Sequence, residues 1–410
     1  MRVVLSSNCW HYHHAAQALE SAGMLDRYIT TVLPDRVPRA LLPTRWREKL
    51  DGRELRGVPA HKVVSLALPE AVHKAMCAAR VFPMDRAHWV QNWLFDRMAR
   101  AHVGHCDVFH FVSGLGLLSA RRAARRGAIV ICDERMEHPD HQRRLLEAEH
   151  ARLGIPYRPE GLPYDAKVKA EYRLSDYLIV GSRYARQTYV DAGWHPKRVF
   201  VVPYGFDPTQ FHPGGEEPGR FRILYVGQII PRKGLHHLVE AFSRLRLPHA
   251  ELWLVGPAEA GFGRRLVARA VADPNIRLFG AVPKSRLREF YQRASVFVMP
   301  SLSDSFGLVC LEAMGCGLPV ITTFTSGAGE LLRDELDGFR IHAGDIEALA
   351  NRLLTLYRHG ELRREMGRSA RERATRFSWS TYQERLLEVY GQICGRPQAR
   401  VEEQMAGGRR

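Results

Sequence analysis

The sequence predicts an α/β protein built from two Rossmann-like domains that face a central cleft. Its 410 residues are too many for one ordinary hydrophobic core and suit two domains. Short apolar runs rich in β-branched residues alternate with amphipathic segments, which is typical of a parallel sheet covered by helices on both faces. Hydrophobic residues make up 45% of the chain, enough for two well-packed cores.

The alternation is clearest in the C-terminal half. Leu235, Leu238, Val239 and Phe242 recur at helical spacing and predict a helix over residues 235–245. Two more helices are expected at 287–294 and 306–314. Strands are expected at residues 222–226, 250–255, 276–279, 296–299 and 319–322.

The N-terminal half shows the same alternation less regularly. Its expected strands cover residues 3–6, 28–32, 108–111, 128–132, 177–180 and 199–202. The Pro- and Gly-rich stretch at 212–219 indicates a domain boundary. We therefore expect an N-terminal domain over 1–205, a C-terminal domain over 206–380, a final helix over 380–394 that packs back on the N-terminal domain, and a disordered tail over 395–410.

Composition excludes several classes of protein. The seven cysteines are scattered and form no CxxC pair, which argues against a disulfide framework or a structural zinc site. The chain has no apolar run of about 18 residues, and its first residues read as a strand rather than a signal peptide, so a cytoplasmic protein is expected. The net charge of +16 favours an anionic partner, although an arginine-rich coding bias explains it equally well.

The loop at residues 227–234 follows a strand and precedes a helix. Free N–H groups and the positive dipole end of a helix attract an anion, and Arg232 and Lys233 add two cationic side chains. This combination suits a diphosphate. The alternative is a surface loop whose charges are merely solvated.

A pair of acids, Asp304 and Glu312, brackets a second strand–loop–helix segment. Eight residues apart, they lie about 80° apart on an ideal helix, and Asp304 at an N-cap position would share a cleft with Glu312. Such carboxylates suit the hydroxyl groups of a sugar and a ribose. The alternatives are an ordinary N-cap and a solvated glutamate.

With these motifs, residues 177–340 resemble the retaining GT-B glycosyltransferases of family 4, known as glycosyl transferases group 1, of the bacterial surface-polysaccharide type. The resemblance rests on the segments DYLIVGSRYARQTYVDAGW, ILYVGQIIPRKGLHHLVEAF, ASVFVMPSLSDSFGLVCLEAMGCGLPVITT and SGAGELLRDELDGFRI, which follow one another in the family's order. It is strong over about residues 170–395 and weaker before them.

The resemblance implies roles for individual residues. Lys233 corresponds to the lysine on the donor diphosphate, Glu312 to the acid on the ribose, and Asp304 to the acid on the transferred sugar. The positions that line the nucleotide sugar are Gly227, Gln228, Gly280, Val282, Ser305, Phe306, Gly307 and Leu308.

The chain departs from the family pattern at three places. Asp304 is shorter than the usual glutamate, and Gln228 replaces an arginine whose charge Arg232 would supply. The glycine-rich loop after the first strand is absent, so its roles would pass to Asn8, His13 or His14.

Beyond the strand at 128–132, His138 corresponds to a family residue that lines the cleft near the anomeric carbon, although a surface histidine beside Pro139 is the plainer interpretation. Arg135 and Gln142 flank His138 in a spacing that some relatives share. No HxxH, DxD or cysteine cluster stands out as a metal site, so we expect a metal-independent enzyme with no cofactor.

The function implied is transfer of a hexose from a UDP- or GDP-type sugar to a glycan or lipid-linked acceptor, with the anomeric configuration retained. The Arg- and Trp-rich segment at residues 36–100, with Trp46, Trp89 and Trp93, would touch the inner face of the plasma membrane, or else pack as core. Two alternatives stay open: a GT-B nucleotide-sugar 2-epimerase, and a non-catalytic basic protein that binds nucleic acid. A specific nucleic-acid partner is not expected, because the basic residues fall mostly on helices.

Overall fold

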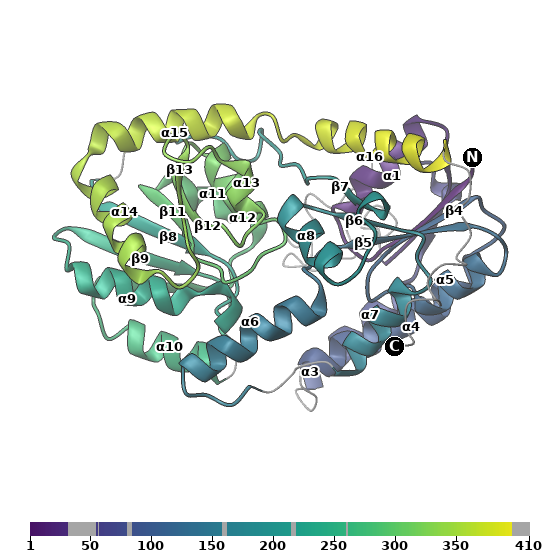
Figure 1. Ribbon diagram of the computed structural model, residues 1–410, viewed down its shortest axis with the longest axis horizontal. Coiled ribbons are helices and arrows are strands. Elements are labelled where there is room, and N and C mark those ends of the chain that lie inside the picture. Colours follow the sequence, from purple (N-terminus) through teal and green to yellow (C-terminus); the bar gives the residue numbers. More distant parts are fainter. Residues whose placement is uncertain are drawn as a thin grey trace, which may run out of the picture.

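The computed structural model describes residues 1–31, 55, 57–79, 84–157, 162–214, 219–259 and 261–395, and these form two α/β units side by side (Figure 1). We call them the N-terminal unit and the C-terminal unit after their sheets. Three features expected from the sequence lie partly or wholly outside the described residues: Trp46, the centre of the 212–219 linker, and the tail beyond Gly395.

The N-terminal unit contains a sheet of strand order β3-β2-β1-β4-β5-β6-β7, in which each pairing is parallel. Its strands are β1 (Val3–Ser6), β2 (Leu25–Thr30), β3 (Val63–Ser65), β4 (Val108–Val112), β5 (Ile129–Glu134), β6 (Tyr177–Val180) and β7 (Val199–Val201). Its helices are α1 (Tyr12–Ser21), η3 (Ala60–Lys62), α3 (Ala67–Ala79), α4 (Met84–His102), α5 (Leu117–Ala124), α6 (Pro139–Arg152), α7 (Leu162–Tyr172), α8 (Arg183–Asp191) and η4 (Pro196–Arg198).

The C-terminal unit contains a parallel sheet of order β10-β9-β8-β11-β12-β13. Its strands are β8 (Phe221–Val226), β9 (Ala250–Val255), β10 (Ile276–Gly280), β11 (Val296–Met299), β12 (Val320–Thr323) and β13 (Gly338–Ile341). Its helices are η5 (Pro231–Lys233), α9 (Leu235–Leu245), α10 (Phe262–Ala270), α11 (Lys284–Gln292), α12 (Leu308–Gly315), α13 (Ala328–Leu331), α14 (Ile346–Arg358) and α15 (Gly360–Ala374).

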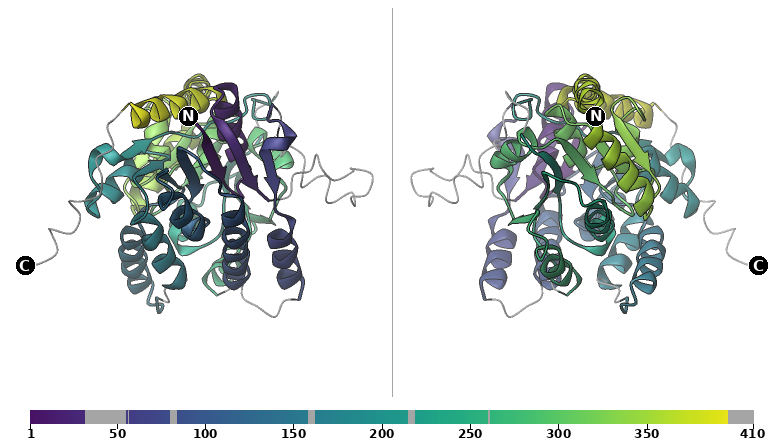
Figure 2. Two further views of the ribbon diagram at one scale, coloured as in Figure 1. Left: turned by 90° about the vertical axis from the view of Figure 1, so that its right-hand side faces the viewer. Right: turned by 90° about the vertical axis from the view of Figure 1, so that its left-hand side faces the viewer.

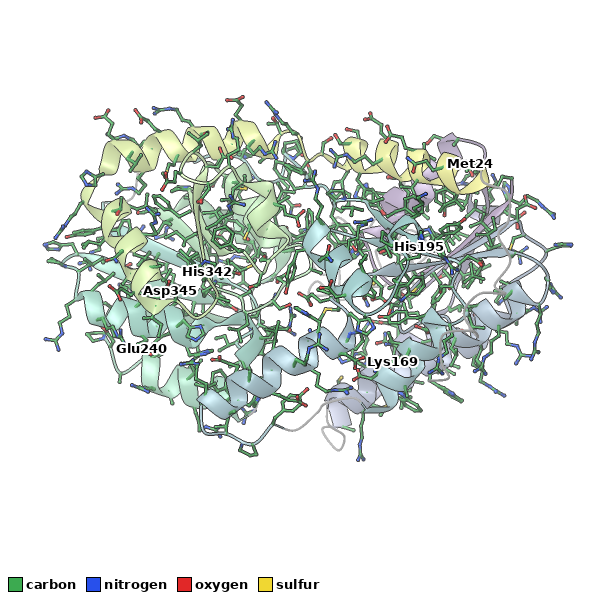
Figure 3. The ribbon with its side chains drawn as sticks, viewed as in Figure 1. Met24, Lys169, His195, Glu240, His342 and Asp345 are labelled. Atoms are coloured by element: carbon green, nitrogen blue, oxygen red, sulfur yellow. The ribbon has the colours of Figure 1, made fainter. Side chains whose placement is uncertain are left out.

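Helices cover both faces of each sheet, which is why the inner strands β1, β4, β11 and β12 are buried along their whole length. In the left view of Figure 2, helices drawn in blue lie below the N-terminal sheet, and the yellow α16 (Trp379–Cys394) lies above it. The four apolar residues that predicted the helix at 235–245 are buried in α9. Local signals set the helix ends as well: the side chain of Asp345, labelled in Figure 3, accepts the N–H of Ala348 at 2.8 Å and caps α14.

The two units are joined at more than one place. After α15 the chain passes to α16, which packs against α1, where Gln383 Nε2 donates to the carbonyl of His14 at 3.2 Å (Figure 1). Elsewhere, Ser305, which follows β11, donates a short hydrogen bond to the carbonyl of Arg135, which follows β5. Because parallel strands end at one edge of their sheet, this contact shows that the carboxyl edges of the two sheets meet.

The expected strands are confirmed within about three residues at each end, and the fold class is confirmed. The expectation missed β3 and β13, which are edge strands of three and four residues. The helix predicted from residue 306 begins at Leu308, because Gly307 adopts a left-handed φ of +80° and stands at its N-cap.

Candidate active site

The loop after β8 places two cationic side chains at the carboxyl edge of the C-terminal sheet. Pro231 starts the one-turn helix η5, which contains Arg232 and Lys233 and ends at Gly234 with φ of +62°. A Cβ atom on Gly234 would lie 2.1 Å from the carbonyl oxygen of Pro300, so only glycine fits there. The loop is therefore packed closely on the segment that follows β11.

Lys233 forms a short ion pair with Asp304. Arg232 Nη1 donates to the carbonyl of Ser303 at 2.9 Å, which brings the second cation to the same place. Burial alone would raise the pKa of Asp304, but the charges of Lys233 and Arg232 outweigh it and the pKa is lowered. The structure thus brings together three of the expected site residues as a charged cluster.

Glu312 lies in a separate cluster on α12. Its side chain is buried, accepts the hydroxyl of Tyr291 at 3.1 Å and lies 3.5 Å from Lys284 Nζ. Burial raises the pKa of this carboxyl, and the nearby Lys284 opposes the rise only in part. Lys284 Nζ also lies 3.8 Å from the ring centroid of Trp10, so the cluster reaches the N-terminal unit.

The expectation that Asp304 caps the helix that carries Glu312 is wrong. Gly307 occupies the cap, and Asp304 accepts the N–H of Phe306 at 3.2 Å from within the loop. Packing explains the glycine: a Cβ atom on Gly307 would lie 2.8 Å from Ala328 Cβ and 2.9 Å from Met299 Cε. Phe306 is buried against the ring of Tyr204 of the N-terminal unit.

Four of the positions expected along the nucleotide sugar lie at the carboxyl ends of β8 and β10, and Gly280 and Val282 are the ones expected at the nucleobase. Gly227 and Gln228 follow β8, Gly280 ends β10, and the N–H of Gly256 donates to the carbonyl of Gly280 at 2.7 Å. Gln228 is exposed and Val282 is half-buried. These residues line the carboxyl edge of one sheet, where open α/β proteins bind ligands.

His138 lies in the N-terminal unit, just before α6. It is buried, with 7% of its surface exposed, so the interpretation as a surface histidine is wrong. It stands at the N-cap of α6, and its Nδ1 accepts the N–H of Asp140 at 3.3 Å. Its ring lies against Tyr172 and Tyr189, and burial lowers its pKa.

Polar groups that the sequence analysis did not single out surround the charged cluster from the N-terminal side. The hydroxyl of Tyr184 donates to Ser303 Oγ at 3.2 Å and contacts His141 Nε2 at 3.0 Å. Glu137 is 1% exposed, and no described residue pairs with its carboxylate oxygens. Burial lowers the pKa of His141 against the opposing charge of Glu137.

One sequence signal was available for Lys284. A lysine at the first position of a helix opposes the helix dipole, and such a placement calls for a compensating anion. Glu312 is that anion. Tyr184, His141 and Glu137 carry no comparable local signal, because their convergence depends on how the two units meet.

Comparison with known proteins identifies the class. Residues 207–373 match the model of the family described as Glycosyl transferases group 1. Solved structures with the same two-unit arrangement include sucrose-phosphate synthase from Thermosynechococcus elongatus, with 20% identity, 96% of this chain and 99% of that chain covered, and a TM-score of 0.62. HepE of Anabaena, solved with UDP-glucose, covers 96% of this chain and 100% of its own, with 16% identity and a TM-score of 0.64. The fold is GT-B, and residues 207–373 are similar to the glycosyl transferases group 1 family.

Curated relatives extend the match. The D-inositol 3-phosphate glycosyltransferase of Geodermatophilus obscurus is 29% identical over 318 residues, which cover 71% of this chain and 68% of that protein. The protein of the same name from Segniliparus rotundus is 32% identical over 213 residues, 48% of this chain. That match spans about half of the relative, 47% of its length.

Proposed function

We propose that this protein is a retaining hexosyltransferase of family 4 that moves a sugar from a nucleoside-diphosphate sugar to an acceptor hydroxyl. The observation that carries the proposal is the pairing of Lys233 with Asp304 beside Arg232. Cations that can hold a diphosphate thus lie next to a carboxylate that can hold sugar hydroxyls. The names of the relatives and the UDP-glucose bound to the HepE structure support this chemistry.

Donor binding would exchange one partner of Lys233 for another. The ammonium group of Lys233, which pairs with Asp304, would pair with the diphosphate instead. The carboxylate of Asp304 would then be able to accept hydrogen bonds from hydroxyl groups of the hexose. Lys233 and Arg232 then neutralise the charge that develops on the diphosphate as the glycosidic bond breaks. No metal is required for this step, since two protein cations replace it.

Glu312 would bind the ribose. Its carboxylate already accepts the hydroxyl of Tyr291, and a ribose 2′- or 3′-hydroxyl can donate to it in the same way. A carboxyl whose pKa is raised by burial gains most from such donors, because they stabilise its charged form. Gly280 and Val282 would lie along the nucleobase.

The C-terminal unit, residues 206–380, would hold the donor, and the N-terminal unit, residues 1–205 with the final helix, the acceptor. His138 would lie on the acceptor side. We assign no protein nucleophile: the acceptor hydroxyl attacks from the face that the diphosphate leaves, and the leaving phosphate takes its proton. Closure of the two units around the substrates would exclude water.

The acceptor would be a glycan or lipid in cell-surface assembly, reached at the inner face of the membrane. Trp89 and Trp93 expose 41% and 42% of their surface on α4, so neither is a core residue. A hollow of about 290 Å³ nearby is lined mostly by arginines: Arg100, Leu118, Arg121, Arg122, Arg125 and Arg126. Such a surface suits anionic headgroups. No helix in the described part of the chain is long and apolar enough to span a membrane.

The test is thermal stabilisation by UDP, GDP, ADP and their common sugar conjugates without added metal. A ligand at about 100 times its dissociation constant stabilises by roughly 2.7 kcal/mol. We expect one nucleotide to stabilise the parent and not Glu312→Ala. If none does and generic nucleic acid does instead, the proposal is wrong. Conversion of the bound sugar to its epimer without any acceptor would favour the 2-epimerase.

A further inference from the structure

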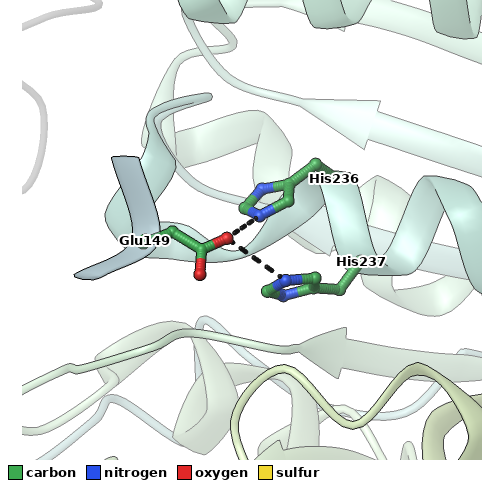
Figure 4. A group of neighbouring side chains, drawn as sticks. All are labelled: Glu149, His236 and His237. Carbon is green, nitrogen blue, oxygen red and sulfur yellow. Dashed lines mark hydrogen bonds and ion pairs between the residues drawn. The ribbon is translucent and has the colours of Figure 1, made fainter. Parts of the chain in front are cut away.

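A second polar cluster lies where α6 of the N-terminal unit meets the first turn of α9. It consists of Glu149 from α6 and the consecutive residues His236 and His237 from α9 (Figure 4). Their side chains are 8%, 10% and 2% exposed. Two imidazoles and a carboxylate from different units are thus buried together, outside the residues assigned to sugar transfer.

The three side chains converge on one point. Glu149 Oε1 lies 2.6 Å from His236 Nε2 and 3.4 Å from His237 Nε2, and one candidate ligand atom of each residue lies within 4.8 Å of the others. Ligands held about 2.1 Å from a tetrahedral metal are about 3.4 Å apart. Adjustments of about 1 Å would therefore turn the hydrogen-bonded cluster into a coordination sphere.

Arg152, one turn along α6 from Glu149, shows that the centre of the cluster already receives a positive charge. Its Nη2 lies 2.6 Å from Glu149 Oε1 and 2.7 Å from His237 Nε2. A guanidinium group is only a donor, so His237 Nε2 accepts and offers its lone pair to the cation. Half of the Arg152 side chain is exposed, 49%, which leaves it a path out to solvent.

We propose that Glu149, His236 and His237 form a binding site for a transition-metal cation of the Zn²⁺ class, and that Arg152 occupies the centre of this site when no metal is bound. Imidazole nitrogens select such ions over Mg²⁺ and Ca²⁺, which prefer oxygen ligands. Water supplies the fourth ligand. His236 lies three residues after Lys233, so a bound ion would hold α6 against the end of the loop at residues 227–234. The site is distinct from the residues proposed for sugar transfer.

The experiment uses the full chain after treatment with a chelator. Zn²⁺ is added in a calorimeter, and Co²⁺ is added separately because its visible absorption reports imidazole ligands and coordination number. We expect one tight equivalent of metal. Glu149→Gln and His237→Gln keep the size and much of the hydrogen bonding of the cluster but replace a good ligand with a poor one. Each should weaken binding at least about tenfold, the lower end of what even outer-shell partners contribute.

The variant Arg152→Ala distinguishes a metal site from a cluster that is held together only by hydrogen bonds. It removes the competing cation, so the metal should bind as tightly as in the parent or more tightly. The exposed His105→Gln is the control for adventitious binding by the chain's 19 histidines and should change nothing. The metal should also raise the thermal midpoint of the parent and of Arg152→Ala, and raise that of Glu149→Gln less.

Two results would overturn the proposal: Zn²⁺ uptake by His237→Gln and Glu149→Gln equal to that of the parent, or weaker uptake by Arg152→Ala. Midpoints measured without metal show whether each variant is folded. Nucleotide binding is measured on the same samples, so a failure of the metal site is distinguishable from a failure of the donor site.

Discussion

The two units have the same parallel architecture, but the buried carboxylate of Asp304 in one has surroundings different from those of Glu134 and Glu171 in the other. In the C-terminal unit Asp304 is held by Lys233, and its pKa is lowered despite burial. In the N-terminal unit burial raises the pKa of Glu134 to about 7 and that of Glu171 to about 8. Glu171 is held by the N–H groups of Gly114 and Gly116, at 2.6 and 3.0 Å. Near neutral pH Asp304 thus stays charged beside its cations, while Glu134 and Glu171 lie close to neutrality. This difference suits the proposed division into a donor side and an acceptor side.

The strongest test of this comparison is to remove the positive charge of Lys233 from the proposed donor side. Lys233→Ala takes away one cation at the departing diphosphate, and losing one preorganised donor of this kind costs about 10²–10³ in kcat. Asp304 also loses its partner, so thermal stabilisation by the nucleotide should disappear. Sugar transfer and the thermal shift with nucleotide are measured together.

His138→Asn is the matched change on the acceptor side. Asparagine is a good N-cap, so α6 should stay capped while the imidazole is lost. We expect slower transfer with unchanged stabilisation by the nucleotide. If His138→Asn abolishes nucleotide binding as Lys233→Ala does, the division of labour between the units is wrong. The control for Lys233→Ala is Lys197→Ala, which removes an exposed lysine side chain elsewhere.

Two glycines of the C-terminal unit test whether the donor edge is fixed by packing. Gly307→Ala places a Cβ atom against Ala328 and Met299 at a φ of +80°, so strain and overpacking should cost about 2–4 kcal/mol together. Gly280→Ala has a similar φ of +65° but nothing within 4 Å of the new atom, and should cost only about 1 kcal/mol. Denaturant unfolding measures both. Equal losses would mean that Gly307 is needed only for its backbone angle.

How far the sequence predicts the structure also differs between the units. The strand–helix alternation and the residues Lys233, Asp304 and Glu312 lie in continuous segments, so local patterns suffice to locate them. The pairing of Lys233 with Asp304 joins residues 71 positions apart, and it follows from the adjacency of β8 and β11 in the sheet.

The rest depends on how the two units meet. The contact of Tyr184 with Ser303 spans 119 positions, and the contact of His236 with Glu149 spans 87. No periodicity in the sequence encodes such contacts. The edge strands β3 and β13 are too short for a clear apolar run. Gly307 is expected along the nucleotide sugar, and its contacts with Ala328 and Met299, which no local pattern predicts, show that packing requires a glycine there as well.

A pH series tests the electrostatic side of the comparison through Glu171. Its folded-state pKa of about 8 lies above the ordinary 4.5, so the folded protein binds more protons than the unfolded chain between these values. Stability from this group is present at pH 4.5 and is lost as the pH rises to about 8. The fall in thermal midpoint from pH 5 to pH 9 should therefore be smaller in Glu171→Gln than in the parent. The exposed Glu240→Gln (Figure 3) should leave the profile of the parent unchanged. A parallel profile in Glu171→Gln would show that this carboxyl titrates normally.

The smallest expected effect concerns the outer surface of the N-terminal unit. Arg121 on α5 and Arg125 at its C-cap are exposed four residues apart and line the arginine-rich hollow. A basic residue near an anionic membrane contributes about 1 kcal/mol, so the double change to glutamate should weaken binding to phosphatidylserine vesicles by at least about 2 kcal/mol. The matched pair Arg265 and Arg269 is exposed at the same spacing on α10 of the C-terminal unit. Flotation with vesicles compares the two double variants at equal net charge. Equal losses would mean that the overall charge of +16, and not a membrane-facing surface, accounts for any binding.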